Sequence, residues 1–129
     1  MRRVFLAVIF LPIVLISGCA KPDKVATFGS PVDGVFYTVE IYDGFGLGSG
    51  TTSVYAHFER NGKSKKMLVL QGDDLTVAKI IWNGPNDVTL CLGTGFTEIF
   101  RNEVTLSLGD SPEPSETISN HLQEHCDAR

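Results

Sequence analysis

The sequence predicts a mainly β protein: an antiparallel sheet or small sandwich of about seven strands, completed by one short C-terminal helix. Three observations predict this class. After residue 30, short runs of alternating apolar and polar residues recur at intervals of about ten residues. Clusters of Gly, Asn, Asp and Pro separate these runs. A helical spacing is found only near the end, where Ile118, Leu122 and Cys126 are four residues apart.

The first predicted strands form a hairpin-rich half of the domain. Residues 30–34 are a Ser-Pro-Val-Asp-Gly turn cluster, and residues 35–42 then alternate with the period of a half-buried strand. Residues 51–60 alternate in the same way. Asn61-Gly62 follows, and this pair favours a type I′ turn, so we expect a hairpin with a return strand over 65–70.

The remaining predicted strands lie between residues 75 and 108. Residues 75–82 are apolar on both parities, which is typical of a strand covered on both faces. Residues 88–92 alternate again. Residues 96–100 and 104–108 are expected to pair as a last hairpin.

A helix is expected after the proline-containing segment 109–114. Ser115 can cap its N-terminus. Ile118, Leu122 and Cys126 would then lie on one stripe of the helix. We expect this stripe to pack on the sheet and to cover its second face.

The N-terminus has the three parts of a secretory signal peptide: Arg2 and Arg3, an apolar run over residues 4–16, and small residues before a cysteine. The apolar run is too short to span a bilayer. Ile16-Ser17-Gly18-Cys19 resembles the lipobox of bacterial lipoproteins. This resemblance implies that the thiol of Cys19 receives a diacylglyceryl group, that residues 1–18 are removed, and that the new N-terminus is acylated with palmitate.

The resemblance also implies an organisation and a location. Residues 1–18 are expected to be the signal peptide, 19–30 a lipidated tether, and 31–129 a single β-rich domain. Ala20 after the lipidated cysteine resembles an outer-membrane sorting signal, so we expect the periplasmic face of the outer membrane in the bacterial cell envelope. The Ser-Pro-x-x-Gly-x-aromatic opening at 30–36 loosely resembles small bacterial envelope proteins of uncharacterised function.

The other two cysteines, Cys91 and Cys126, form an even pair in a domain expected to be exported. We therefore expect a disulfide between them. Two free thiols are the alternative that the sequence leaves open.

The segment 43–50 reads Asp-Gly-Phe-Gly-Leu-Gly-Ser-Gly. It lacks the following helix of a dinucleotide fingerprint and the Lys-Ser/Thr ending of a Walker loop. Phe45 and Leu47 are apolar residues on this loop. They either fold back onto the core or form an exposed tip that binds a partner, and they are the binding residues that the sequence predicts.

No residue set in the sequence predicts catalysis, a metal site or a cofactor. His121 and His125 are four residues apart but lack further ligands in an appropriate pattern, and Ser49 and His57 do not match a nucleophile elbow. The chain has 15 acidic and 11 basic residues, which disfavours binding to nucleic acid. We expect a non-enzymatic binding module for a protein or cell-wall ligand, possible roles being inhibitor or immunity protein; the alternative is a structural or assembly accessory of an envelope complex.

Overall fold

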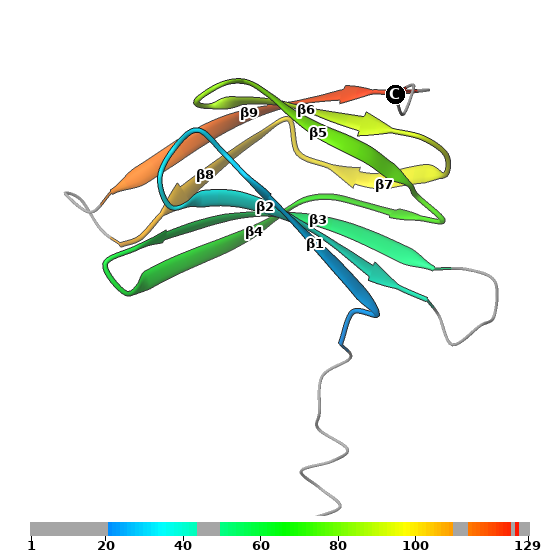
Figure 1. Ribbon diagram of the computed structural model, residues 1–129, viewed down its shortest axis with the longest axis horizontal. Coiled ribbons are helices and arrows are strands. Elements are labelled where there is room, and N and C mark those ends of the chain that lie inside the picture. Colours follow the sequence, from blue (N-terminus) through cyan, green and yellow to red (C-terminus); the bar gives the residue numbers. More distant parts are fainter. Residues whose placement is uncertain (1–20, 44–49, 110–113, 125, 127–129) are drawn as a thin grey trace, which may run out of the picture.

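The computed structural model describes residues 21–43, 50–109, 114–124 and 126, and in this part of the chain nine β-strands form two facing sheets (Figure 1). The prediction of a mainly β fold is confirmed. The strands are β1 (Lys24–Gly29), β2 (Val35–Tyr42), β3 (Thr51–Arg60), β4 (Lys63–Asp73), β5 (Val77–Gly84), β6 (Asp87–Leu92), β7 (Phe96–Phe100), β8 (Glu103–Ser107) and β9 (Ser115–Gln123).

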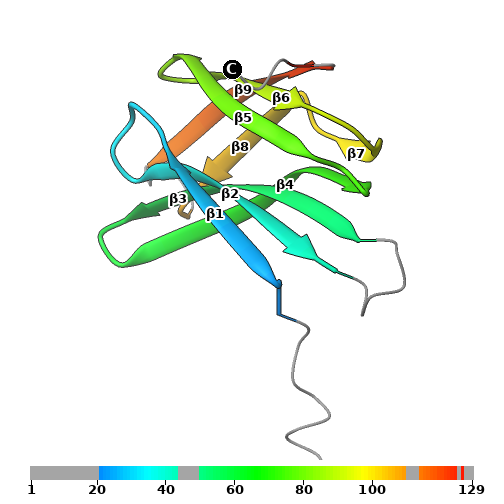
Figure 2. The same cartoon turned by 45° about the vertical axis from the view of Figure 1, so that its right-hand side comes forward.

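One sheet has the strand order β1-β2-β3-β4-β7 and the other has the order β5-β6-β9-β8. All neighbouring strands are antiparallel except β6 and β9, which are parallel. The two sheets face each other as a sandwich (Figure 2). β1 and β5 are edge strands on the same side of this sandwich, since residues of both line one cavity.

The hairpin between β3 and β4 follows from its turn residues. Asn61 and Gly62 have φ values of 53° and 79°, so both central residues of the turn have the positive φ that a type I′ turn requires. The prediction of this hairpin is confirmed.

A β-bulge in β4, opposite Val54 and Tyr55, leaves Val69 without a partner in β3. The carbonyl of Val69 accepts a hydrogen bond from Arg101 N at 2.8 Å.

The core lies between the sheets and is built from the alternate residues of the strands whose side chains point inward. Its largest fully buried apolar side chains are Tyr37, Phe58, Leu70, Leu90, Leu106 and Ile118. The Tyr37 hydroxyl donates to Asn120 Oδ1 across the core, and Asn120 Nδ2 donates to Arg101 O at 3.1 Å. Burial raises the pKa of Tyr37, so its hydroxyl stays protonated and donates this bond.

The predicted C-terminal helix is wrong, because residues 115–123 form β9, which lies between β6 and β8. The spacing of Ile118 and Leu122 fits a strand as well as a helix. Ile118, Asn120 and Leu122 all face the core, and the polar Asn120 between the two apolar residues hides the strand alternation.

The predicted tether is also wrong in part, since residues 24–29 form β1 ahead of the expected domain boundary at 31. β1 pairs antiparallel with β2 from Lys24↔Ile41 to Gly29↔Phe36. Five of its six residues are exposed, and Phe28 alone is half-buried. An edge strand exposed on this scale has little apolar alternation, which is why its sequence pattern does not predict it.

Two predicted pairings differ from the structure as well. β7 and β8 do not form a hairpin, because β7 pairs with β4 and β8 pairs with β9, so the chain changes sheets at Arg101 and Asn102. β5 is not covered on both faces: it is an edge strand, and Ile81 on its outer face is exposed.

Candidate functional site

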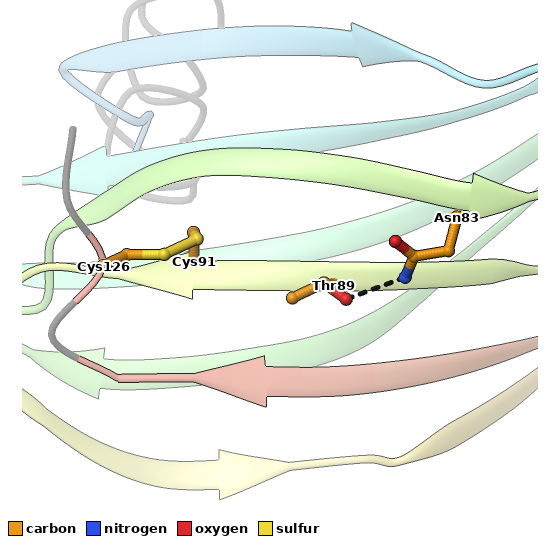
Figure 3. The surroundings of a disulfide bond; sticks show 4 residues. All are labelled: Asn83, Thr89, Cys91 and Cys126. Atoms are coloured by element: carbon orange, nitrogen blue, oxygen red, sulfur yellow. Dashed lines mark hydrogen bonds between the residues drawn. A yellow bond between two sulfur atoms is a disulfide. The ribbon is translucent and has the colours of Figure 1, made fainter. Parts of the chain in front are cut away.

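The two paired cysteines lie at one end of the four-stranded sheet. Cys91 in β6 and Cys126 after β9 are joined in a disulfide with their Cα atoms 5.4 Å apart (Figure 3). Cys91 is only 1% exposed and lies on the outer face, opposite to the inward Leu90 and Leu92. Cys126 N also donates to Leu92 O at 2.9 Å, so the disulfide and this bond together hold the chain after β9 against β6.

The other predicted site residues, Cys19, Phe45 and Leu47, lie outside the described residues. The residues on either side of the glycine-rich segment are described. Asp43 follows β2, Gly50 precedes β3, and both line a cavity at this end of the sandwich.

This cavity has a volume of about 660 Å³. A second cavity of about 490 Å³ adjoins it and shares Val39, Ile41 and Val77 with it. We refer to the two together as the edge groove. Its lining residues are Lys24, Val25, Ala26, Phe28, Val39, Ile41, Asp43, Gly50, Thr52, Asp74, Leu75, Thr76 and Val77.

The groove forms because two edge strands leave the sandwich open on one side. Ala26 and Phe28 are the inward residues of β1, and Ala26 is too small to fill the space beside Val39, its partner in β2. Val77 contributes the opposite wall from β5. The floor is fixed by Thr52, whose hydroxyl donates to Leu75 O at 2.8 Å. The result is an apolar surface that no described strand covers.

The rim of the groove is acidic. Asp43 N donates to Asp23 Oδ2 at 2.7 Å, and Asp74 Oδ1 accepts a bond from Gly50 N at 3.1 Å, so backbone contacts hold these carboxylates at the groove end. Among the described residues, no cation forms an ion pair with Asp43 or Asp74. Lys24 is the one cation in the described lining.

Further negative charge lies at the same end of the sandwich. Asp73 ends β4 and precedes Asp74, and Glu98 lies on the neighbouring β7. A side-chain hydrogen bond with Asp73, and then the charge of Asp73, raises the pKa of Glu98. This direction of shift is the effect expected of two carboxyl groups close together.

A second set of contacts covers the outer face of the five-stranded sheet. Phe36 stacks on His57 with ring centroids 4.5 Å apart, and His57 Nε2 lies 2.8 Å from the Thr38 hydroxyl. Lys66 Nζ pairs with Glu40 at 3.1 Å and lies 4.1 Å from the centre of the Tyr55 ring. These side chains stack, form hydrogen bonds and form an ion pair with one another, so we interpret them as packing on the outer face of the sheet.

Burial, and then the charge of Lys66, lowers the pKa of His57. In the described part of the chain, no carboxylate forms a hydrogen bond with His57 that would orient it as a general base.

The described residues contain no group of three or more His, Cys, Asp or Glu placed to hold a metal ion. His121 lies in β9, with Nε2 2.7 Å from Asp87 Oδ1, whereas His125 lies outside the described residues. Within the same ranges, no helix has the length and apolar character needed to cross a membrane.

Comparison with known protein families, curated proteins and solved structures finds no match to this chain. The candidate site therefore rests on the sequence and on the geometry above. The alternation of residues 35–42 predicts that Val39 and Ile41 face the same side of their strand, and the structure confirms this. It missed the groove, because a groove depends on which strands are the edges of each sheet, and no local pattern carries that information.

Proposed function

We propose that this protein is a membrane-anchored lipoprotein of the bacterial envelope that acts as a non-enzymatic binding module, with the edge groove as its binding site. The observation that carries the proposal is the groove itself, in which apolar residues of both sheets stay uncovered beside an acidic rim. An apolar hollow with a few polar groups at its margin is the usual form of a binding site.

The polar groups of the groove favour binding over catalysis. The Thr52 hydroxyl is engaged with Leu75 O, and the Asp74 carboxylate is engaged with Gly50 N. The described lining residues include no histidine that could act as a base and no cysteine that could act as a nucleophile. A binding module needs only a complementary shape and charge, which this lining offers.

The anchor is supported by the signal peptide and by Ile16-Ser17-Gly18-Cys19. We predict that the intact mass of the mature protein, purified from membranes, corresponds to a chain that begins at Cys19 and carries added acyl mass. Cys19→Ser should abolish this mass and leave the signal peptide in place. Recovery of an unmodified chain that begins at Met1 from wild-type cells would remove the anchor from the proposal.

The binding site can be tested in intact cells by site-specific crosslinking. A photo-crosslinking amino acid at Lys24, which lines the groove, is expected to capture a partner. The same amino acid at Asn61, in the hairpin at the opposite end of the sandwich, serves as the matched control and should capture none. If crosslinks form in equal yield at both positions and join the protein to one stoichiometric membrane assembly, the result would favour the alternative role of a structural accessory of an envelope complex.

A further inference from the structure

We propose that the edge groove binds an extended polypeptide segment, which adds to β1 as an antiparallel strand, inserts alternate aliphatic side chains into the groove and places a basic residue on the acidic rim. This inference deepens the proposed function and rests on it, because it names the class of ligand for the same site. Strand addition of this kind uses backbone hydrogen bonds for affinity and side-chain pockets for specificity.

The first argument is the open backbone of β1. β1 pairs with β2 alone among the described strands. Ser30 N donates to Val35 O at 3.2 Å, so the backbone of Ser30 points toward β2. Along an antiparallel strand, every second residue bonds the same neighbour, and the residues between them point to the other side. The N–H and C=O groups of Val25, Thr27 and Gly29 therefore point away from β2. The strand contains no proline to interrupt a new ladder.

The second argument is the apolar surface beside that edge. Inward residues alternate with outward residues along a strand, so Ala26 and Phe28 face the groove while Val25 and Thr27 face outward. A strand added next to β1 would direct every second side chain into the space over Ile41 and Val77. Aliphatic residues at these positions would bury this uncovered surface, which favours binding.

The third argument is charge. Asp43 and Asp74 line the groove, Asp23 contacts the Asp43 backbone, and Lys24 is the one cation of the described lining. This end of the groove is therefore net negative and complements a basic side chain. β1 begins at this end, so the C-terminal end of an antiparallel segment would lie here, and we place the basic residue there.

The probe is a fluorescent, amidated short peptide in which valine alternates with threonine and whose last residue is lysine. Its binding is measured by anisotropy with the mature lipoprotein in neutral detergent micelles, and empty micelles are the control for adsorption. We expect saturable binding that weakens with salt. Exchange of the terminal lysine for glutamate should weaken binding about tenfold, because it replaces attraction to the rim with repulsion.

Backbone methylation tests the strand geometry without any change to the protein. Residues that lie opposite Val25 and Thr27 in an antiparallel pair point their side chains outward, so the peptide's threonine amides would face β1. N-methylation of the threonines should abolish binding, whereas N-methylation of the valines should leave it within about twofold. Equal binding by the two methylated peptides would overturn strand addition, and the reverse preference would overturn the antiparallel orientation.

The rim is tested with Asp43→Asn/Asp74→Asn, in which the amide oxygen at position 74 can still accept the bond from Gly50 N and the backbone bond of residue 43 to Asp23 is kept. We expect about fivefold weaker binding of the lysine peptide and loss of its preference over the glutamate peptide. Asp33→Asn/Glu59→Gln makes the same change in net charge at the opposite end of the sandwich, where Glu59 N donates to Gly34 O beside the β3–β4 hairpin, and should bind like the wild type. Equal binding by both double variants would place the peptide elsewhere and overturn the proposal.

Failure here can be separated from failure of the proposed function. If Lys24 captures a partner in cells but none of these peptides binds, the ligand is not an extended basic segment, and the binding module remains. Concentration-dependent dimerisation of the mature protein that is lost when Val25 is replaced by lysine would instead assign the β1 edge to a second copy of this chain, and it would overturn the inference.

Discussion

Removal of the Cys91–Cys126 bridge is a stringent test of the fold. The cysteines are 35 residues apart in sequence, and cross-linking a loop of this length is expected to stabilise a domain by about 4 kcal/mol through the chain entropy of the unfolded state. In the folded state the bridge lies on the outer face of β6, while Trp82 faces the core and packs edge-on against Tyr37 with ring centroids 5.2 Å apart. The bridge and the tryptophan therefore lie on opposite faces of one sheet.

We predict that Cys91→Ala/Cys126→Ala lowers the free energy of unfolding by up to about 4 kcal/mol and leaves the native Trp82 emission unchanged. The expected fall in Tm is roughly 15 °C for a domain of this size. Urea unfolding followed by Trp82 fluorescence gives the free energy of unfolding and the native emission, and thermal unfolding followed by far-UV circular dichroism gives Tm. A thiol assay on the denatured, unreduced wild type should first detect neither cysteine.

Two outcomes would refute this reasoning. A red shift of Trp82 in the native double variant would mean that the bridge keeps the core closed, as the predicted helix on the sheet would have required. An unchanged unfolding midpoint would mean that the bridge does not stabilise the fold by restricting the unfolded chain, as the chain-entropy argument requires.

Two further predictions concern buried polar groups. Tyr37→Phe should lower the free energy of unfolding by about 1–3 kcal/mol in urea titrations, because Asn120 Oδ1 would lose its donor inside the core, and a loss near zero would show that water replaces the hydroxyl. The pKa of His57 is lowered by burial and by Lys66, so the unfolded chain binds a proton more readily than the folded one, and stability should fall as the pH drops below about 6.5. His57→Gln should flatten this part of the stability profile, and an unchanged slope would assign it to other groups.

The strands with a buried and an exposed face could be predicted from the sequence. Residues 35–42 and 51–60 alternate strictly, and the structure has strands at these positions. Asn61-Gly62 correctly predicted a type I′ turn, because the conformation of this turn depends on those two residues. These features are local, so a local pattern is sufficient to predict them.

The features that depend on partners could not be predicted in this way. The four-residue spacing of Ile118 and Leu122 predicts a helix where β9 lies. Asn120 completes the inward face of the strand, and its place there is explained only by Tyr37 on the opposite sheet. β1 was expected to be a tether because an exposed edge strand has no apolar pattern. The groove depends on β1 and on the edge position of β5, since its walls come from these two strands, and neither position follows from a local pattern.

The position of β1 also constrains where a ligand would meet the protein. β1 begins at Lys24, five residues after Cys19, at the end of the sandwich where β2 ends and β3 begins (Figure 1). An extended chain spans at most about 3.4 Å per residue, so a lipid on Cys19 would hold this end within roughly 17 Å of the bilayer. The acidic rim lies at the same end. If the protein is anchored as proposed, the groove would therefore bind its ligand close to the membrane surface. The Asn61 hairpin would lie at the end of the sandwich away from that surface.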